Sequence, residues 1–189
     1  MTPDRRNSKN RPASFLELDQ RRRRRVVVVA VIRSIVTLAV ILAVYFQFPV
    51  SGFASGTAAA AWIRLIALLL IFLIAMALQI QLVLTSGVPQ VRAAEAVVQS
   101  VALFLCLFAL LYVSISVTDP QSFSEPLSRV DALYLTTATF ATVGFGDVVP
   151  IDTLARVAVT IQMITGLGLL ILIVKVVFFA ARQGLLRRS

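Results

Sequence analysis

The sequence contains no histidine and a single cysteine, Cys106. The missing histidine excludes zinc sites and proton switches that depend on imidazole, and one cysteine excludes a disulfide within the chain. Cys106 stands in an apolar run, where we expect a small apolar side chain facing lipid or a neighbouring helix. Charge is also scarce: 14% of the 189 residues are charged, against about 25% in a typical soluble domain, and 59% are hydrophobic. This composition indicates a membrane protein.

The positive charge is gathered at one end of the chain. The net charge is +9, and half of the eighteen basic residues precede Val26, including consecutive arginines at 21–25. Such a run is found in nucleic-acid-binding proteins, and also as the cytoplasmic anchor of membrane proteins. Because apolar sequence follows directly, we predict that residues 1–25 form a basic cytoplasmic tail with no nucleic-acid partner. Contact with anionic lipid headgroups is compatible with that role.

Four apolar stretches follow the tail, at 26–48, 58–84, 97–117 and 154–181. Each meets the requirement of about 20 residues for a helix that crosses a hydrocarbon core about 30 Å thick. Backbone N–H and C=O groups find no water in lipid, so each stretch should form a helix that pairs these groups internally. The sequence therefore predicts four transmembrane helices.

Basic residues in the connections set the expected orientation. The segment 49–61 has no charge and should lie outside, whereas 85–96 carries Arg92 and 182–189 carries three arginines, so both should lie inside. We therefore expect a multi-pass protein of the cell membrane with both termini in the cytoplasm. Because little sequence follows Ala181, no cytoplasmic ligand-sensing domain is expected.

The connection 118–153 is long, and its middle is apolar. Residues 132–141 are too few to span the bilayer, which is typical of a re-entrant segment. Non-helical backbone at membrane depth persists only where protein or a water-filled cavity surrounds it. This loop should therefore dip into a pore, and its acidic residues should concentrate cations at the mouth.

Residues 142–147 read TVGFGD, which resembles the signature of the potassium-channel pore family. A short helical segment precedes this hexamer, and apolar spans flank both, in the order of the family's outer helix, pore helix, filter and inner helix. The resemblance covers 97–181 and implies an outer helix, a re-entrant pore helix, a filter loop and an inner helix. Together with the apolar stretches before it, the expected fold is an all-α membrane protein with four transmembrane helices that assembles as a tetramer. The expected parts are two additional helices over 26–84, a cytoplasmic loop at 85–96, the outer helix at 97–117, the pore helix at 131–141, the filter at 142–146, the inner helix at 154–181 and a cytoplasmic tail at 182–189.

Glycine conformation explains how such a loop can meet a bare cation. Gly144 and Gly146 can adopt φ > 0 without steric cost, so alternating backbone angles would turn successive carbonyl groups to the same side. The resemblance places Asp147 at the outer mouth and implies K+ ligands at four main-chain carbonyls, joined by the Thr142 hydroxyl: those of Thr142, Val143, Gly144 and Phe145. Four loops are needed to complete the ligand rings, so we expect a homotetramer in membrane lipid, with K+ as the permeant ion and no cofactor.

Two positions depart from the family pattern. Phe145 replaces the usual tyrosine, so selectivity should survive while a hydroxyl that can tie the filter to the pore helix is lost. Ala138 occupies the position of a carboxylate that pairs with the filter aspartate in some bacterial members, so the filter should be held differently, and its inactivation is left open. Gly166 resembles the hinge glycine of the inner helix; a bend that opens the pore and a notch for close packing are both compatible with it.

The two additional spans lack the pattern of a voltage sensor, which needs arginines at every third position of one helix. They hold one arginine each, Arg33 and Arg64, and no acidic residue lies between Asp19 and Glu95 to serve as a countercharge. We predict weak or absent voltage dependence, an Arg33 side chain that snorkels to the inner surface, and a packing role for both spans. As opening stimuli, pH, lipid, membrane tension and a partner subunit are all open.

The sequence therefore predicts a passive potassium-selective channel. An enzyme is not expected, because the sequence has no nucleophile with a paired acid and base and no metal cluster. Two alternatives stay open: a non-selective cation channel of the same architecture, and a non-conducting membrane scaffold or accessory subunit. Phe145 argues against the first, because the resembling non-selective members have a polar or acidic residue at that position.

Overall fold

The computed structural model describes residues 20–48 and 89–185, together with isolated positions between 63 and 81. Most of the predicted N-terminal tail and most of the predicted second span, 58–84, lie outside the described residues, although the described positions of that span are helical. The described part is all-helical apart from loops and one isolated bridge between Phe123 and Pro150. Its helices are α1 (Gln20–Gln47), α3 (Pro89–Thr118), α4 (Arg129–Phe140) and α5 (Thr153–Leu185).

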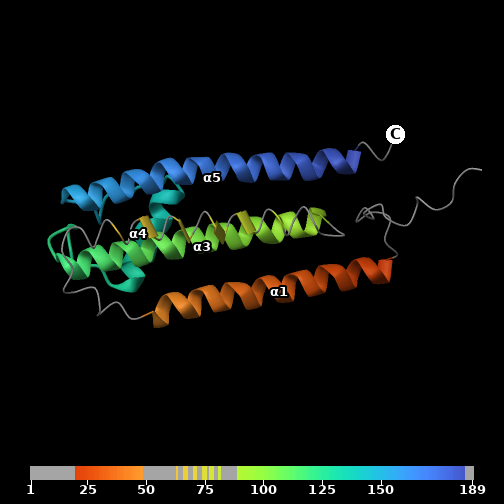
Figure 1. Cartoon of the computed structure of the whole chain (residues 1–189), viewed down its shortest axis with the longest axis horizontal. Coiled ribbons are helices and arrows are strands. Elements are labelled where there is room, and N and C mark those ends of the chain that lie inside the picture. Colours follow the sequence, from red (N-terminus) through yellow and green to blue (C-terminus); the bar gives the residue numbers. More distant parts are fainter. Residues whose placement is uncertain are drawn as a thin grey trace, which may run out of the picture.

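Three long helices lie side by side along the length of the molecule, with the short helix α4 beside α3 near one end (Figure 1). Helix α3 is central, because it contacts α1, α4 and α5. Three segments are long and apolar enough to cross a membrane, by length and composition: Arg24–Gln47, Val91–Thr118 and Thr153–Lys175. Only 6% of the residues in the most apolar stretch of α1 are buried, against 61% in the corresponding stretch of α3. Helix α1 therefore exposes apolar side chains, as a lipid-facing helix does.

Helices α3 and α1 begin six or more residues earlier than the sequence patterns predict. Helix α3 starts at Pro89, so the expected loop over 85–96 is wrong from that residue onward. Proline is favoured in the first turn, because its missing N–H would have no helical partner there, and the alanines that follow it are the strongest helix formers. Helix α1 starts at Gln20, so the arginines at 21–25 continue the helix instead of belonging to a separate tail.

Side-chain caps fix the starts of α4 and α5, the helices that precede and follow the candidate site. Ser128 Oγ accepts a hydrogen bond from the Asp131 N–H at 3.3 Å, and Asp131 Oδ2 accepts from the Ser128 N–H at 3.0 Å. This capping box starts α4 at Arg129, two residues before the predicted pore helix. Asp152 caps α5 in a similar way, by accepting from the Leu154 N–H at 2.9 Å.

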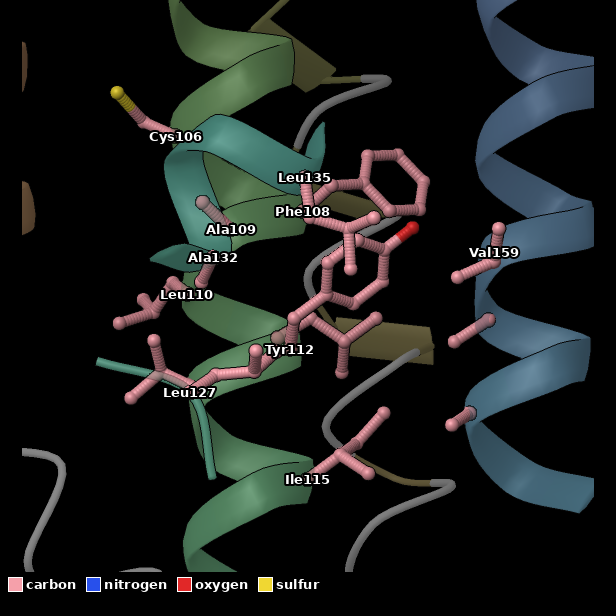
Figure 2. Close-up of a cluster of buried hydrophobic side chains, with 14 of the residues drawn as sticks. Cys106, Phe108, Ala109, Leu110, Tyr112, Ile115, Leu127, Ala132, Leu135 and Val159 are labelled. Atoms are coloured by element: carbon pink, nitrogen blue, oxygen red, sulfur yellow. The ribbon is translucent and has the colours of Figure 1, made fainter. Parts of the chain in front are cut away.

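The core lies where α3 meets α4 and α5, and the largest of its fully buried side chains are Tyr112, Phe104 and Phe123. Figure 2 shows Tyr112 reaching from α3 toward Val159 on α5. Cys106 also belongs to this cluster and is 6% exposed, so it packs inside the protein and does not face lipid. The packed face of α3 holds α4 in place, and α4 positions the loop that follows it.

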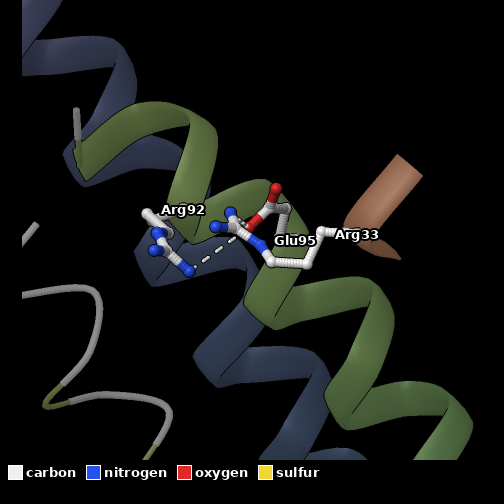
Figure 3. A network of polar contacts seen from close by, with 3 residues as sticks. All are labelled: Arg33, Arg92 and Glu95. Carbon is white, nitrogen blue, oxygen red and sulfur yellow. Dashed lines mark hydrogen bonds and ion pairs between the residues drawn. The ribbon is translucent and has the colours of Figure 1, made fainter. Parts of the chain in front are cut away.

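An ion pair joins α1 to the first turns of α3, where Arg33 donates to the Glu95 carboxylate (Figure 3). Arg92 approaches the same carboxylate oxygen at 3.8 Å, and Glu95 is only 7% exposed. The two additional spans hold no acidic residue, but Arg33 finds its countercharge on α3; snorkelling of its side chain to the inner surface stays a prediction. Burying a carboxylate is costly unless a charge compensates it, and Arg33 supplies that charge from another helix.

Candidate functional site

The segment 142–146 follows directly after the C-terminal end of α4 and has an unusual backbone. Thr142, Gly144 and Gly146 have φ values of +58°, +57° and +78°, and within the described residues no other position has positive φ. The two glycines thus adopt the conformation predicted for them, and Thr142 joins them at a steric cost that glycine avoids. A Cβ added at Gly144 or Gly146 would meet nothing within 4 Å. Glycine is therefore favoured at these positions by the positive φ angle and not by a lack of space.

The first three amide groups of this segment donate hydrogen bonds to α4. The Thr142 N–H donates to Thr139 O at 3.1 Å, and the N–H groups of Val143 and Gly144 donate to Ala138 O at 3.0 and 3.4 Å. These bonds satisfy carbonyls that the end of a helix otherwise leaves without partners. They also fold the segment back against α4, so the short helix sets where the segment runs.

The carbonyl groups of the same segment are used differently. Within the described part of the chain, the main-chain oxygens of four consecutive residues accept no hydrogen bond, and all four residues are exposed: Thr142, Val143, Gly144 and Phe145. A backbone carbonyl is a strong acceptor that is normally paired. A run of exposed carbonyls on a fixed backbone is therefore a set of oxygen ligands suited to a hard cation.

Tyr134 on α4 holds the far end of the segment. Its hydroxyl donates to Asp147 Oδ2 at 2.7 Å, and its ring stacks on Phe145 with the centroids 6.1 Å apart. Sequence reasoning missed Tyr134, although it lies one helical turn before Ala138 and so on the same face of α4. With Ala138 in place of a carboxylate, the segment was predicted to be held in a different way. In the structure, the Tyr134 hydroxyl makes the contact from α4 to Asp147.

The hydrogen bond from Tyr134 lowers the pKa of Asp147 and raises the pKa of Tyr134 itself. A lowered carboxyl pKa means that the link contributes fully above the ordinary aspartate pKa of about 3.9 and is lost as pH falls through the lowered value. A raised phenol pKa means that the link is kept below about pH 10 and is lost as pH rises through the raised value. The link should therefore persist from about pH 4 to pH 10.

In a Tyr134→Phe variant the ring remains but the donor is gone, so we expect the pKa of Asp147 to rise toward its ordinary value. An NMR titration of the Asp147 carboxyl in isotopically labelled protein measures this shift. Val130→Ala, at an exposed position of the same helix, is the control and should leave the titration unchanged. An identical Asp147 titration curve in wild type and Tyr134→Phe would show that the hydrogen bond does not form.

A buried polar junction lies behind the segment and joins three helices. Gln162 of α5 accepts from the Tyr112 hydroxyl of α3 and donates from Nε2 to the Thr136 carbonyl of α4 at 2.9 Å. None of the three residues is more than 1% exposed. Sequence reasoning also missed Gln162, although an amide inside a long apolar span must find hydrogen-bond partners, and this requirement was a usable signal.

Gly166 lies one turn further along α5, beside the end of α4. A Cβ at this position would lie 3.4 Å from Phe140 Cδ2 and 3.6 Å from Phe104 Cζ, whereas Gly168 has nothing within 4 Å. Helix α5 continues without a break through both glycines. The structure thus favours the packing notch of the two readings of Gly166, and a hinge at this position stays a prediction. A hollow of about 120 Å³ opens between this part of α5 and Thr142.

Comparisons with known proteins bear on the same part of the chain. Residues 100–183 match the family model described as "Ion channel", a range that includes most of α3, all of α4 and the segment 142–147. A stretch of 48 residues is 44% identical to the calcium-gated potassium channel TvoK of Thermoplasma volcanium, and it covers 25% of this chain and 14% of that protein. No solved structure matches the chain. Helix α1 lies outside the range that the family model covers.

Proposed function

We propose that the chain is a subunit of a channel that conducts K+ selectively and passively, because residues 100–183 match the ion-channel family model and a 48-residue stretch is similar to a calcium-gated potassium channel. It is therefore a channel protein and not an enzyme. The observation that carries the proposal is the different use of amides and carbonyls after α4: the N–H groups at 142–144 donate to α4, whereas the carbonyls at 142–145 accept no hydrogen bond within the described part of the chain.

The proposed chemistry is the replacement of water by main-chain oxygen. A potassium ion leaves water readily only where other oxygens take the place of its hydration shell, and rings of backbone carbonyls do this in potassium channels. One chain contributes one such segment, so we propose that four chains surround a common axis. The negative end of the α4 dipole and the Asp147 carboxylate favour a cation on this path.

The membrane setting is part of the same proposal. We place α1, the predicted span at 58–84, α3 and α5 across the cell membrane. These four crossings put both chain termini on one side, and the positive charge at 21–25 places that side in the cytoplasm. TvoK is a potassium channel, and we propose the same permeant ion for this chain. We do not extend calcium gating to this chain, because the matched stretch covers only 14% of TvoK.

The test uses the full chain, purified in detergent and then reconstituted. Light scattering should give the mass of four chains of 20.6 kDa each. Single-channel recording in bilayers under opposed K+ and Na+ gradients should give a reversal potential close to the K+ equilibrium potential. Equal K+ and Na+ permeability would indicate a non-selective cation channel instead, and an assembled tetramer without flux would indicate a membrane scaffold.

A further inference from the structure

The end of α1 is fastened to the beginning of α4. The Arg129 guanidinium donates two hydrogen bonds to α1, from Nη1 to the Tyr45 carbonyl and from Nη2 to the Phe48 carbonyl. In return, the Tyr45 hydroxyl donates to the Arg129 carbonyl at 2.5 Å. The guanidinium carbon also lies 5.9 Å from the centre of the Tyr45 ring, and Tyr45 is 3% exposed. Two residues that are far apart in sequence thus make a reciprocal contact.

The positive charge of Arg129 is favoured by the end of α1 and not by the start of α4. Arg129 is the first residue of α4, where the helix dipole is positive and disfavours a cation. The opposite holds at the end of α1, where the last carbonyls lack helical partners and the dipole is negative. Helix α1 has no basic residue in its own last turn. Arg129 therefore supplies from another helix the cation that the end of α1 lacks.

A second contact fixes α1 further back. Arg33 pairs with the buried Glu95 of α3, and the twelve residues from Arg33 to Tyr45 correspond to about 18 Å of helix. Only 6% of the residues in the most apolar stretch of α1 are buried, so apolar packing within the described part of the chain encloses α1 less than it encloses α3. Polar contacts at two separate levels therefore fix both the tilt and the position of α1 against the rest of the molecule.

Helix α4 connects the contact between Arg129 and Tyr45 to the segment 142–146, the candidate filter. It has 12 residues, about 18 Å of helix, with Arg129 at its first position. Its later turns provide Tyr134, which holds Asp147, and Ala138, whose carbonyl accepts the N–H groups of Val143 and Gly144. A short helix moves as a rigid rod, so a shift of its first turn reaches the segment at its other end.

We propose that Arg129 is a positioning residue that ties α1 to α4, so that α1, although outside the family-matched range, keeps the segment 142–146 in its conducting conformation. This inference rests on the proposed function for its effect on conduction. The contact itself, and its effect on the order of the segment, stand apart from that function.

The test compares graded variants of the full-length protein. Arg129→Lys keeps the positive charge but loses the planar guanidinium that reaches two carbonyls. Arg129→Gln loses the charge as well as the guanidinium. Tyr45→Phe keeps the ring and removes only the return hydrogen bond. Lys175→Gln removes a positive charge from an exposed position of α5 and is the control.

The first readout is hydrogen exchange of the backbone amides at 142–144, measured in detergent or lipid nanodiscs. Arg129→Gln should speed their exchange about tenfold, the effect of losing one charge-assisted hydrogen bond. Arg129→Lys and Tyr45→Phe should give smaller increases, and Lys175→Gln none. The milder variants keep the test decisive if Arg129→Gln does not fold. Unchanged exchange in Arg129→Lys and Tyr45→Phe would overturn the proposal.

The second readout is the fraction of time that single channels conduct in bilayers. We expect it to fall severalfold in Arg129→Lys, with the K+ current through an open channel unchanged. Wild-type conduction in an Arg129→Lys channel would show that the arginine acts only through its charge, and would overturn the proposal. A wild-type protein without K+-selective flux would instead refute the proposed function, and the exchange measurement would still decide the role of Arg129.

Discussion

Replacing Gly144 with alanine should abolish K+-selective conduction. Gly144 has a φ of +57°, where a side chain brings Cβ too close to the following carbonyl oxygen. The cost is about 1–2 kcal/mol per residue, and four subunits would carry it together, so about 4–8 kcal/mol opposes the conducting conformation. Because a Cβ at this position meets no atom within 4 Å, the chain has room to fold with alanine but should relax to another backbone angle.

Relaxation would turn at least one carbonyl away from its neighbours, which would break the proposed column of oxygen ligands. Single-channel recording and K+ flux into liposomes measure the loss. Gly168→Ala is the matched control, since Gly168 is helical, also has open space around it, and should gain about 0.5–1 kcal/mol of helix stability from alanine. Wild-type selectivity in a conducting Gly144→Ala channel would contradict the assigned role of this backbone angle.

The second large effect is expected at the junction of the three helices, where Gln162→Leu should destabilise the protein by about 1–3 kcal/mol per chain. Leucine has a similar size but leaves the buried Tyr112 hydroxyl without its acceptor and removes a donor to Thr136 O. An unsatisfied buried polar group costs more than a hydrogen bond contributes, so Tyr112→Phe alone should also destabilise the protein, through the orphaned amide oxygen of Gln162.

A double variant separates this mechanism from a simple loss of packing. Combining Gln162→Leu with Tyr112→Phe removes both polar partners, so it should be more stable than Gln162→Leu alone. The midpoint of thermal unfolding in detergent measures all three proteins, with Met163→Leu, an exposed neighbour on α5, as the control. Additive losses in the double variant would show that the two side chains are not coupled.

The features that follow from local chemistry were predictable from the sequence. The apolar spans, the short helix before the glycine segment and the positive φ of Gly144 and Gly146 each depend on residue type and near neighbours. The start of α3 was missed because the predicted span begins with the apolar run at Val97, after Arg92 and the charged Glu95. In the structure Arg33 neutralises that charge from 62 positions away, so helix is possible there.

The contacts that hold the segment were not predictable in the same way. Gln162 is 50 positions from Tyr112, and Arg129 is 84 positions from Tyr45. No periodicity or motif joins such pairs, because they meet only when whole helices are packed against one another. Tyr134 and Asp147 are 13 positions apart, and their contact needs the chain to fold back on α4 through three residues with positive φ.

The close fit of Gly166 against Phe140 has a mechanical consequence. Phe140 is the last residue of α4, and the segment with the exposed carbonyls begins two residues later. If α5 kinks at Gly166, the ring of Phe140 must either follow it or lose its contact. A gate that works by such a kink would therefore pull on the backbone proposed to bind the ion every time it opened, so gating and ion coordination would be mechanically coupled.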